Sequence, residues 1–193
     1  VSVAAQQEVS NPWGAPPEQV TEQQTIQRTL MAQSFALAMP GIWTLYYGDE
    51  IALVGAQDPD NRRPYPWSQT LHSTQQRLYT HLQVLGRSRR CLFGVLDDEV
   101  GFETVSDSKI TLTRRNLNNN ELRLIVMIDR DASATQTRVS NYELNTRPGQ
   151  PWIDLLSGEQ FTTTLEGLTV ETNITGVRWL LPASDPCAVF GEL

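Results

Sequence analysis

Two small groups of charged residues are candidates for binding or orienting a ligand. Gly48-Asp49-Glu50 places two carboxylates next to each other, and Asp58 and Arg62 lie four residues apart in a polar, proline-rich segment. Adjacent carboxylates can orient neighbouring groups or cap a loop. A carboxylate accepts hydrogen bonds from vicinal hydroxyls and a guanidinium donates in a planar fork, so an Asp and an Arg together suit a polar ligand.

The elements around the two carboxylates predict where they lie. Residues 18–39 carry apolar side chains at helical spacing, and Pro40-Gly41 ends that helix. Residues 42–47, Ile-Trp-Thr-Leu-Tyr-Tyr, are typical of a short strand buried on both faces, as in a parallel sheet or barrel. Asp49 and Glu50 then follow its C-terminal end, with side chains on opposite faces. A second helix is predicted after the loop of residues 57–67, capped by Ser68 or Thr70.

The second half of the chain predicts only β-strands. Alternating segments at 110–112 and 122–126 flank an Asn-rich turn at 116–120, which indicates a hairpin. The segment Trp152 to Glu159 predicts a strand running into a turn. Several short strands at this spacing favour an antiparallel sandwich; the others are expected at 99–105, 139–144, 165–170 and 177–181.

Composition excludes several function classes. The 193 residues carry a formal net charge of −7, and Lys109 is the only lysine. An acidic chain without a basic stripe suits neither nucleic acid phosphates nor an anionic membrane, so neither partner is expected. No apolar run approaches the roughly 20 residues of a membrane span. His72 and His81 have no metal-ligand spacing, so neither a metal nor another cofactor is expected.

Cys91 and Cys187 are far apart in the sequence. We interpret them as two unpaired small hydrophobic residues; the alternative is a disulfide that ties the start of the second half to its tail. The chain starts at Val1 rather than Met, so we expect a piece of a longer protein, and no compartment is predicted.

Two motifs carry a family resemblance. Residues 40–51, Pro-Gly-Ile-Trp-Thr-Leu-Tyr-Tyr-Gly-Asp-Glu-Ile, resemble the eighth barrel strand of α-amylase-family (family 13) glycoside hydrolases. Residues 58–67, Asp-Pro-Asp-Asn-Arg-Arg-Pro-Tyr-Pro-Trp, resemble the loop after that strand, most closely in the neopullulanase and cyclomaltodextrinase group. The resemblance implies an α+β fragment in two parts: residues 1–90 would be the last strand and two helices of a (β/α)8 barrel, and residues 91–193 an antiparallel C-terminal β-sandwich.

The resemblance also implies roles for the charged residues. Asp58 and Arg62 would bind sugar hydroxyls on the non-reducing side of the cleavage point; the alternative is an internal ion pair that holds the loop. Asp49 and Glu50 would orient groups at the barrel mouth or cap a loop, and Arg63 would pair with another carboxylate.

The aromatic residues have alternatives of their own. Trp67 and Tyr65 could stack on a sugar, although residues after proline more often fill a hydrophobic gap. Trp152 and Trp179 are expected to pack between the sheets of the sandwich rather than to bind carbohydrate.

No catalytic residue is predicted in this chain. The family's nucleophile, acid/base and third carboxylate lie on earlier barrel strands, and residues 1–39 hold no Asn-His-Asp-type motif. Retaining glycosidases need two carboxyl groups about 5–5.5 Å apart, which Asp49 and Glu50 on opposite faces cannot supply. We therefore expect an inactive C-terminal portion of a retaining hydrolase or transglycosylase of maltodextrins, cyclodextrins or pullulan, with the remainder of the barrel as its partner. The alternative is a free-standing, non-catalytic module that binds glucan or protein.

Overall fold

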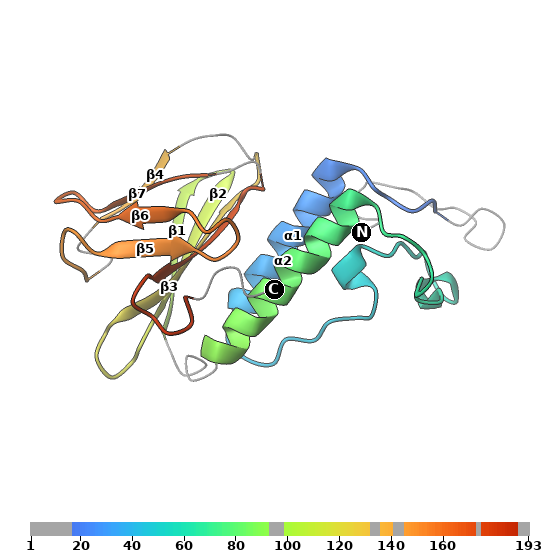
Figure 1. Ribbon diagram of the computed structural model, residues 1–193, viewed down its shortest axis with the longest axis horizontal. Helices are drawn as coiled ribbons and strands as arrows, with labels where there is room; N and C mark the ends of the chain where they lie inside the picture. Colours follow the sequence, from blue (N-terminus) through green and yellow to red (C-terminus); the bar gives the residue numbers. More distant parts are fainter. Residues whose placement is uncertain (1–16, 93–98, 132–135, 141–144, 173–174, 189–193) are drawn as a thin grey trace. The chain divides into compact units, whose positions relative to one another are not determined.

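The computed structural model describes residues 17–92, 99–131, 136–140, 145–172 and 175–188 (Figure 1). Two α-helices, α1 (Gln23–Ala38) and α2 (Ser73–Cys91), precede a set of antiparallel strands. The chain forms two compact units. Unit 1 comprises the described residues up to Gln33 together with Trp43–Gln83, and unit 2 comprises Ser34–Ile42 and the described residues from Val84 onward. Each helix therefore begins in unit 1 and ends in unit 2.

Both helices begin later than the sequence pattern predicts. Before α1, the side-chain amide of Gln19 donates to the Ala52 carbonyl at 2.8 Å and accepts from the Val54 amide at 3.3 Å, so residue 19 bridges to a distant segment. Before α2, the backbone amide of His72 donates to the Gln75 side chain at 3.1 Å. In return, the His72 ring Nδ1 accepts from the Thr74 amide at 3.3 Å. This pair of bonds caps the helix, which starts at Ser73, and the predicted caps at Ser68 and Thr70 are wrong.

The predicted buried strand at residues 42–47 is also wrong in this structure. The segment has no strand, and the side chain of Ile42 is 99% exposed while Tyr46 and Tyr47 are half exposed. A strand buried on both faces needs a neighbour on each side. Every strand pair among the described residues is antiparallel and formed after residue 98, so this segment has no partner strand.

The core of unit 1 is built on the segment that follows. Ile51, Ala52 and Val54 are buried, and they are tied to α2 by the Gln75 side chain, which donates to the Ile51 carbonyl at 2.8 Å. The Thr74 hydroxyl donates to the Thr21 carbonyl at 2.9 Å. These bonds hold the start of α2 against the segment that carries the predicted site.

Unit 2 contains two antiparallel sheets. The larger has the order β1 (Glu99–Ser106), β2 (Lys109–Arg115), β3 (Leu122–Asp129), β8 (Val177–Pro182), β5 (Pro151–Asp154) and β6 (Gln160–Thr162). The smaller pairs β4 (Gln136–Val139) with β7 (Leu168–Glu171).

Most predicted strands of unit 2 are confirmed. The β2–β3 hairpin turns through Asn120 at φ 55°, and Trp152 lies in a strand that leads into a turn. β7 starts later than predicted because Thr164 and Gly167 form a tight bridge first. The predicted strand at 139–144 meets only the end of β4 at Val139; residues 141–144 lie outside the described residues.

The two sheets share one hydrophobic core. Side chains from both, including Trp152 of the larger sheet and Val170 of the smaller, pack into a single buried cluster. Trp152 and Trp179 are each 1% exposed. The expected packing of Trp152 between the sheets is therefore confirmed. Trp179 is equally buried but lies outside this cluster and lines a small cavity with Leu37, Ala38 and Arg89, so its expected place between the sheets is wrong.

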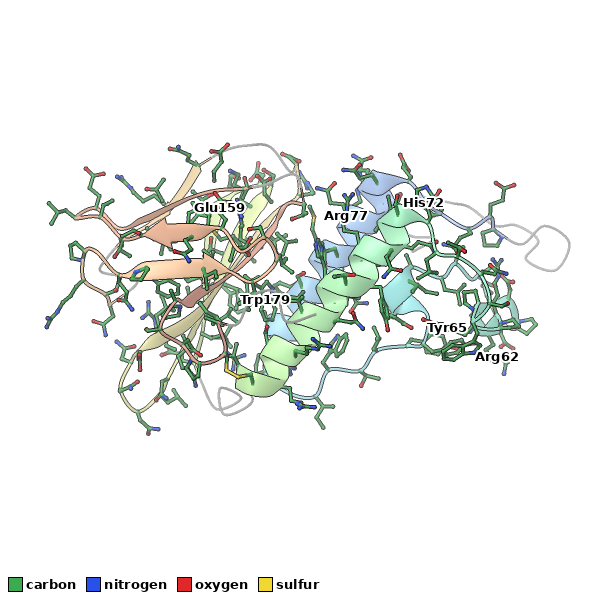
Figure 2. All side chains as sticks on the ribbon, in the orientation of Figure 1. Arg62, Tyr65, His72, Arg77, Glu159 and Trp179 are labelled. Carbon is green, nitrogen blue, oxygen red and sulfur yellow. A yellow bond between two sulfur atoms is a disulfide. The ribbon has the colours of Figure 1, made fainter. Side chains whose placement is uncertain are left out.

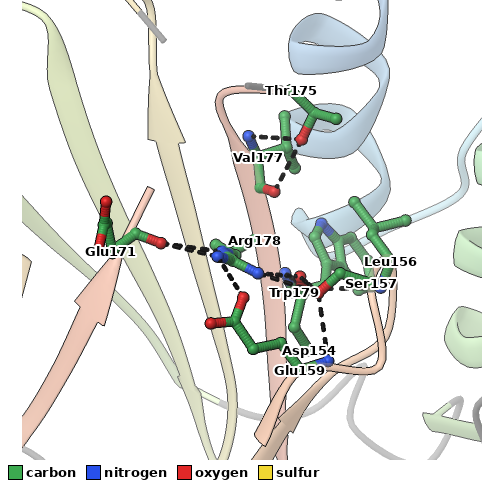
Figure 3. Close-up of polar contacts among 9 residues, drawn as sticks. All are labelled: Asp154, Leu156, Ser157, Glu159, Glu171, Thr175, Val177, Arg178 and Trp179. Atoms are coloured by element: carbon green, nitrogen blue, oxygen red, sulfur yellow. Dashed lines mark hydrogen bonds and ion pairs between the residues drawn. The ribbon is translucent and has the colours of Figure 1, made fainter. Parts of the chain in front are cut away.

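A buried ion pair joins β5 and β8 (Figure 3). The Arg178 guanidinium lies 2.8 Å from Asp154 and 2.7 Å from Glu159, and it donates to the Glu171 carbonyl at 2.8 Å. The second Asp154 oxygen accepts from the Trp179 amide at 3.0 Å. Asp154 is fully buried, so its charge depends on these partners.

The end of α2 is bonded to the tail of the chain. Cys91 and Cys187 form a disulfide with Cα atoms 5.7 Å apart, so their interpretation as unpaired residues is wrong. The Arg89 guanidinium donates to the Met39 carbonyl at 2.8 Å, and Arg114 of β2 donates to the Ala38 carbonyl at 2.9 Å. These arginines satisfy carbonyls that the end of α1 leaves without helical partners.

Candidate functional site

The candidate site lies in unit 1, in the segment that runs from Gly48 to Trp67. Asp49 and Glu50 do not follow a strand but form the 3₁₀-helix η1 (Asp49–Ile51), preceded by Gly48 in the left-handed conformation at φ 92°. The Glu50 carboxylate turns back and accepts a hydrogen bond from the Gly48 amide at 2.8 Å. Burial raises the pKa of Asp49.

Asp58 and Arg62 are brought together. The Arg62 guanidinium lies 2.5 Å from the Asp58 carboxylate, and the two side chains are 61% and 70% exposed. An exposed pair of this kind contributes little to stability. Its donors and acceptors face solvent, where a polar ligand can reach them.

A second Asp–Arg pair shapes the same loop from within. Arg63 donates two hydrogen bonds to Asp60, at 2.7 and 2.8 Å, and the Ala56 amide donates to the same carboxylate at 2.8 Å. The hydrogen bond from Arg63 lowers the pKa of Asp60. Arg63 therefore pairs with a carboxylate as the sequence predicts, although the sequence did not indicate that Asp60 in η2 (Asp60–Arg62) is the partner.

Two tyrosines fasten the loop to the segment before η1. The Tyr47 hydroxyl donates to the Arg63 carbonyl at 3.0 Å, and the Tyr46 hydroxyl donates to the Asn61 carbonyl at 3.4 Å. Their rings are in contact, with centroids 4.8 Å apart. The composition of residues 42–47 predicts a buried strand for both tyrosines, so the sequence does not indicate this role.

Tyr65 and Trp67 form the aromatic end of the loop (Figure 2, where Tyr65 and Arg62 are labelled). Their ring centroids are 4.4 Å apart with planes tilted by 43°. Burial, followed by a hydrogen bond to Glu50, raises the pKa of Tyr65 to about 12. Trp67 is 87% exposed, so the expectation that it fills a hydrophobic gap is wrong.

The arrangement supplies groups that can bind a polar ligand. It offers an exposed carboxylate, an exposed guanidinium and an exposed indole on a loop held by internal bonds. Within the described ranges, no group of three or more His, Cys, Asp or Glu side chains could hold a metal ion. Among those same residues no helix is long and apolar enough to cross a membrane.

Known proteins resemble the chain in sequence. A cyclomaltodextrinase of Geobacillus thermopakistaniensis (strain MAS1) is 29% identical over 136 residues, which is 70% of this chain and 22% of the relative. An amylopullulanase of Thermoanaerobacterium saccharolyticum is 25% identical over 167 residues, 82% of this chain and 13% of the relative. The chain thus spans less than a quarter of the length of either. No family model matches it.

Solved structures resemble its fold. An α-amylase from Geobacillus thermoleovorans, complexed with acarbose, superposes with a TM-score of 0.67 at 21% identity, covering 80% of this chain and 33% of that one. An α-amylase from Malbranchea cinnamomea gives 0.64 at 18% identity, covering 81% and 33%. Together with the sequence relatives, these confirm the resemblance to the C-terminal region of α-amylase-family glycoside hydrolases, and they agree with a mixed fold of two helices and antiparallel sheets.

Proposed function

We propose that this chain is the C-terminal portion of a retaining α-glucan hydrolase or transglycosylase, acting on maltodextrins, cyclodextrins or pullulan. The observation that carries the proposal is the exposed Asp58–Arg62 pair on a loop fastened by internal hydrogen bonds. The names of the sequence relatives, cyclomaltodextrinase and amylopullulanase, support the same substrate class.

In this proposal the chain has two parts. Residues 1–90 complete the end of a (β/α)8 barrel, and residues 91–193 form the C-terminal β-sandwich. The exposure of Ile42 and the half exposure of Tyr46 and Tyr47 support this division, because apolar side chains of a barrel strand would be covered by the neighbouring strands of the longer protein. The remainder of the barrel is then the main partner of this chain.

Asp58 and Arg62 are the proposed sugar-binding residues. Each hydroxyl of a glucose unit both donates and accepts, so a carboxylate and a guanidinium held side by side can engage two adjacent hydroxyls. Glu50 and Arg63 position this loop through the bonds described above, and Asp49 lies next to Glu50 in η1. The catalytic carboxylates belong to the rest of the barrel, so this chain alone is expected to be inactive.

The test starts from the polypeptide that the native host makes. We expect an intact mass that adds most of a barrel of roughly 250 residues to this chain, together with hydrolysis of cyclodextrin and pullulan. Arg62→Ala should raise KM more than it lowers kcat, because the lost contact binds ground state and transition state alike. Arg130→Ala is the matched control, since Arg130 forms an equally exposed pair with Asp131 in unit 2. A native product of this length alone, or an unchanged KM for Arg62→Ala, would contradict the proposal.

A further inference from the structure

Among the residues that the structure describes, Trp67 has the most exposed aromatic side chain, at 87%. It belongs to the loop that carries Asp58 and Arg62. Because the indole of Trp67 is exposed, burial does not stabilise it. Held against a second ring, however, it offers a flat, preformed surface.

The position of the indole is set by its neighbours. The Trp67 amide donates to the Tyr65 carbonyl at 2.9 Å, and the Tyr65 ring lies against the indole with centroids 4.4 Å apart. Tyr65 is itself half-buried and hydrogen-bonded to Glu50, whose carboxylate accepts from the Gly48 amide at 2.8 Å. The exposed ring therefore rests on residues anchored to η1.

We propose that Trp67 is an aromatic platform that stacks on the apolar face of a pyranose ring in an α-glucan. The inference rests on the proposed function and adds to it a binding residue beyond the Asp58–Arg62 pair. The C–H groups on one face of a glucose ring carry partial positive charge, and the face of an indole is negative, so the two attract while water is excluded from both.

The charges around Trp67 favour a neutral ligand with many hydroxyls. The loop's two Asp–Arg pairs, Asp58–Arg62 and Asp60–Arg63, each sum to zero charge. A phosphate-bearing ligand would meet no excess of positive charge there, and the whole chain carries −7. A glucan instead offers an apolar ring face for the indole and hydroxyls for the charged pair.

The test titrates this chain with β-cyclodextrin and with maltoheptaose, by calorimetry and by tryptophan fluorescence. Trp67 should respond because it faces solvent, whereas Trp152 and Trp179 are buried in unit 2. Trp67→Ala should weaken binding roughly two- to twelvefold, the range expected for one aromatic stacking contact. Trp67→Phe should retain most of the affinity, because it keeps a stacking face. Phe102→Ala, which removes a 54% exposed aromatic ring from unit 2, is the matched control and should change nothing.

The outcomes separate this inference from the proposed function. If Arg62→Ala weakens binding and Trp67→Ala does not, the platform is wrong and the sugar-binding loop stands. The platform is also wrong if Trp67→Ala and Trp67→Phe weaken binding equally, or if the unmodified chain binds neither glucan. In those cases the proposed function is tested separately, by the activity of the longer native product. If Trp67→Ala instead disrupts only association with the rest of the barrel, Trp67 is a docking residue and the inference is overturned.

Discussion

The disulfide between Cys91 and Cys187 is expected to supply much of the stability of unit 2. It joins residues 96 apart in sequence. Closing a loop of that size in the unfolded chain removes conformational entropy worth about 4.7 kcal/mol at 25 °C. Whole domains are stable by only about 5–15 kcal/mol, so the double variant Cys91→Ser/Cys187→Ser should be close to unfolding under conditions where the oxidised chain is folded.

Urea unfolding followed by tryptophan fluorescence measures the contribution of the disulfide to the stability of unit 2. Trp152 and Trp179 are buried in the core of unit 2 and become exposed when it unfolds. With a typical urea m-value of about 2 kcal/mol/M, the full entropic effect shifts the midpoint by roughly 2 M. Each single Cys→Ser variant should lose as much as the double variant, because either one breaks the same bond.

Two results would refute this reasoning. One is a midpoint for the double variant within about 0.3 M of the oxidised chain, which corresponds to less than 1 kcal/mol. The other is a thiol titration that finds both cysteines reactive in the folded chain made without reductant. In either case the entropy of loop closure would not be a source of stability for unit 2.

Three further perturbations test other parts of the structure by urea unfolding or titration. Arg178→Met should cost about 3–5 kcal/mol, because it leaves the buried Asp154 carboxylate without its charged partner; a loss below about 1 kcal/mol would contradict this. Gly167→Ala should cost about 2 kcal/mol or more, since Gly167 has φ +128° and an added Cβ would overlap the Val139 carbonyl oxygen. Its control, Gly86→Ala, meets no atom within 4 Å in α2 and should stabilise by about 0.5–1 kcal/mol; equal effects at the two glycines would contradict the strain argument. Tyr65 has its pKa raised to about 12, so its contribution to stability is complete below pH 10 and is lost as pH rises toward 12. Ultraviolet titration of Tyr65→Phe should lack the ionisation near pH 12 that the unmodified chain shows, and an unchanged titration would contradict this assignment.

Features that depend on neighbours along the chain can be predicted from the sequence. The β2–β3 hairpin follows from alternation on both sides of an Asn-rich turn, and α1 ends just before the predicted Pro40-Gly41 breaker. The family resemblance rests likewise on two motifs at a defined spacing, residues 40–51 and 58–67. Such features are local, so their residue types are enough to predict them.

Features that need distant partners depend on the folded structure. Residues 42–47 have the composition of a buried strand, but a strand forms only beside another strand, and the described chain supplies none there. Cys91 meets Cys187 because α2 ends where the chain returns after β8, across 96 residues. In the loop, Arg63 forms its ion pair with Asp60 rather than with another carboxylate, and the Trp67 side chain remains exposed to solvent. Which of several suitable partners a side chain contacts depends on how the folded backbone brings them together, and residue types alone do not contain that information.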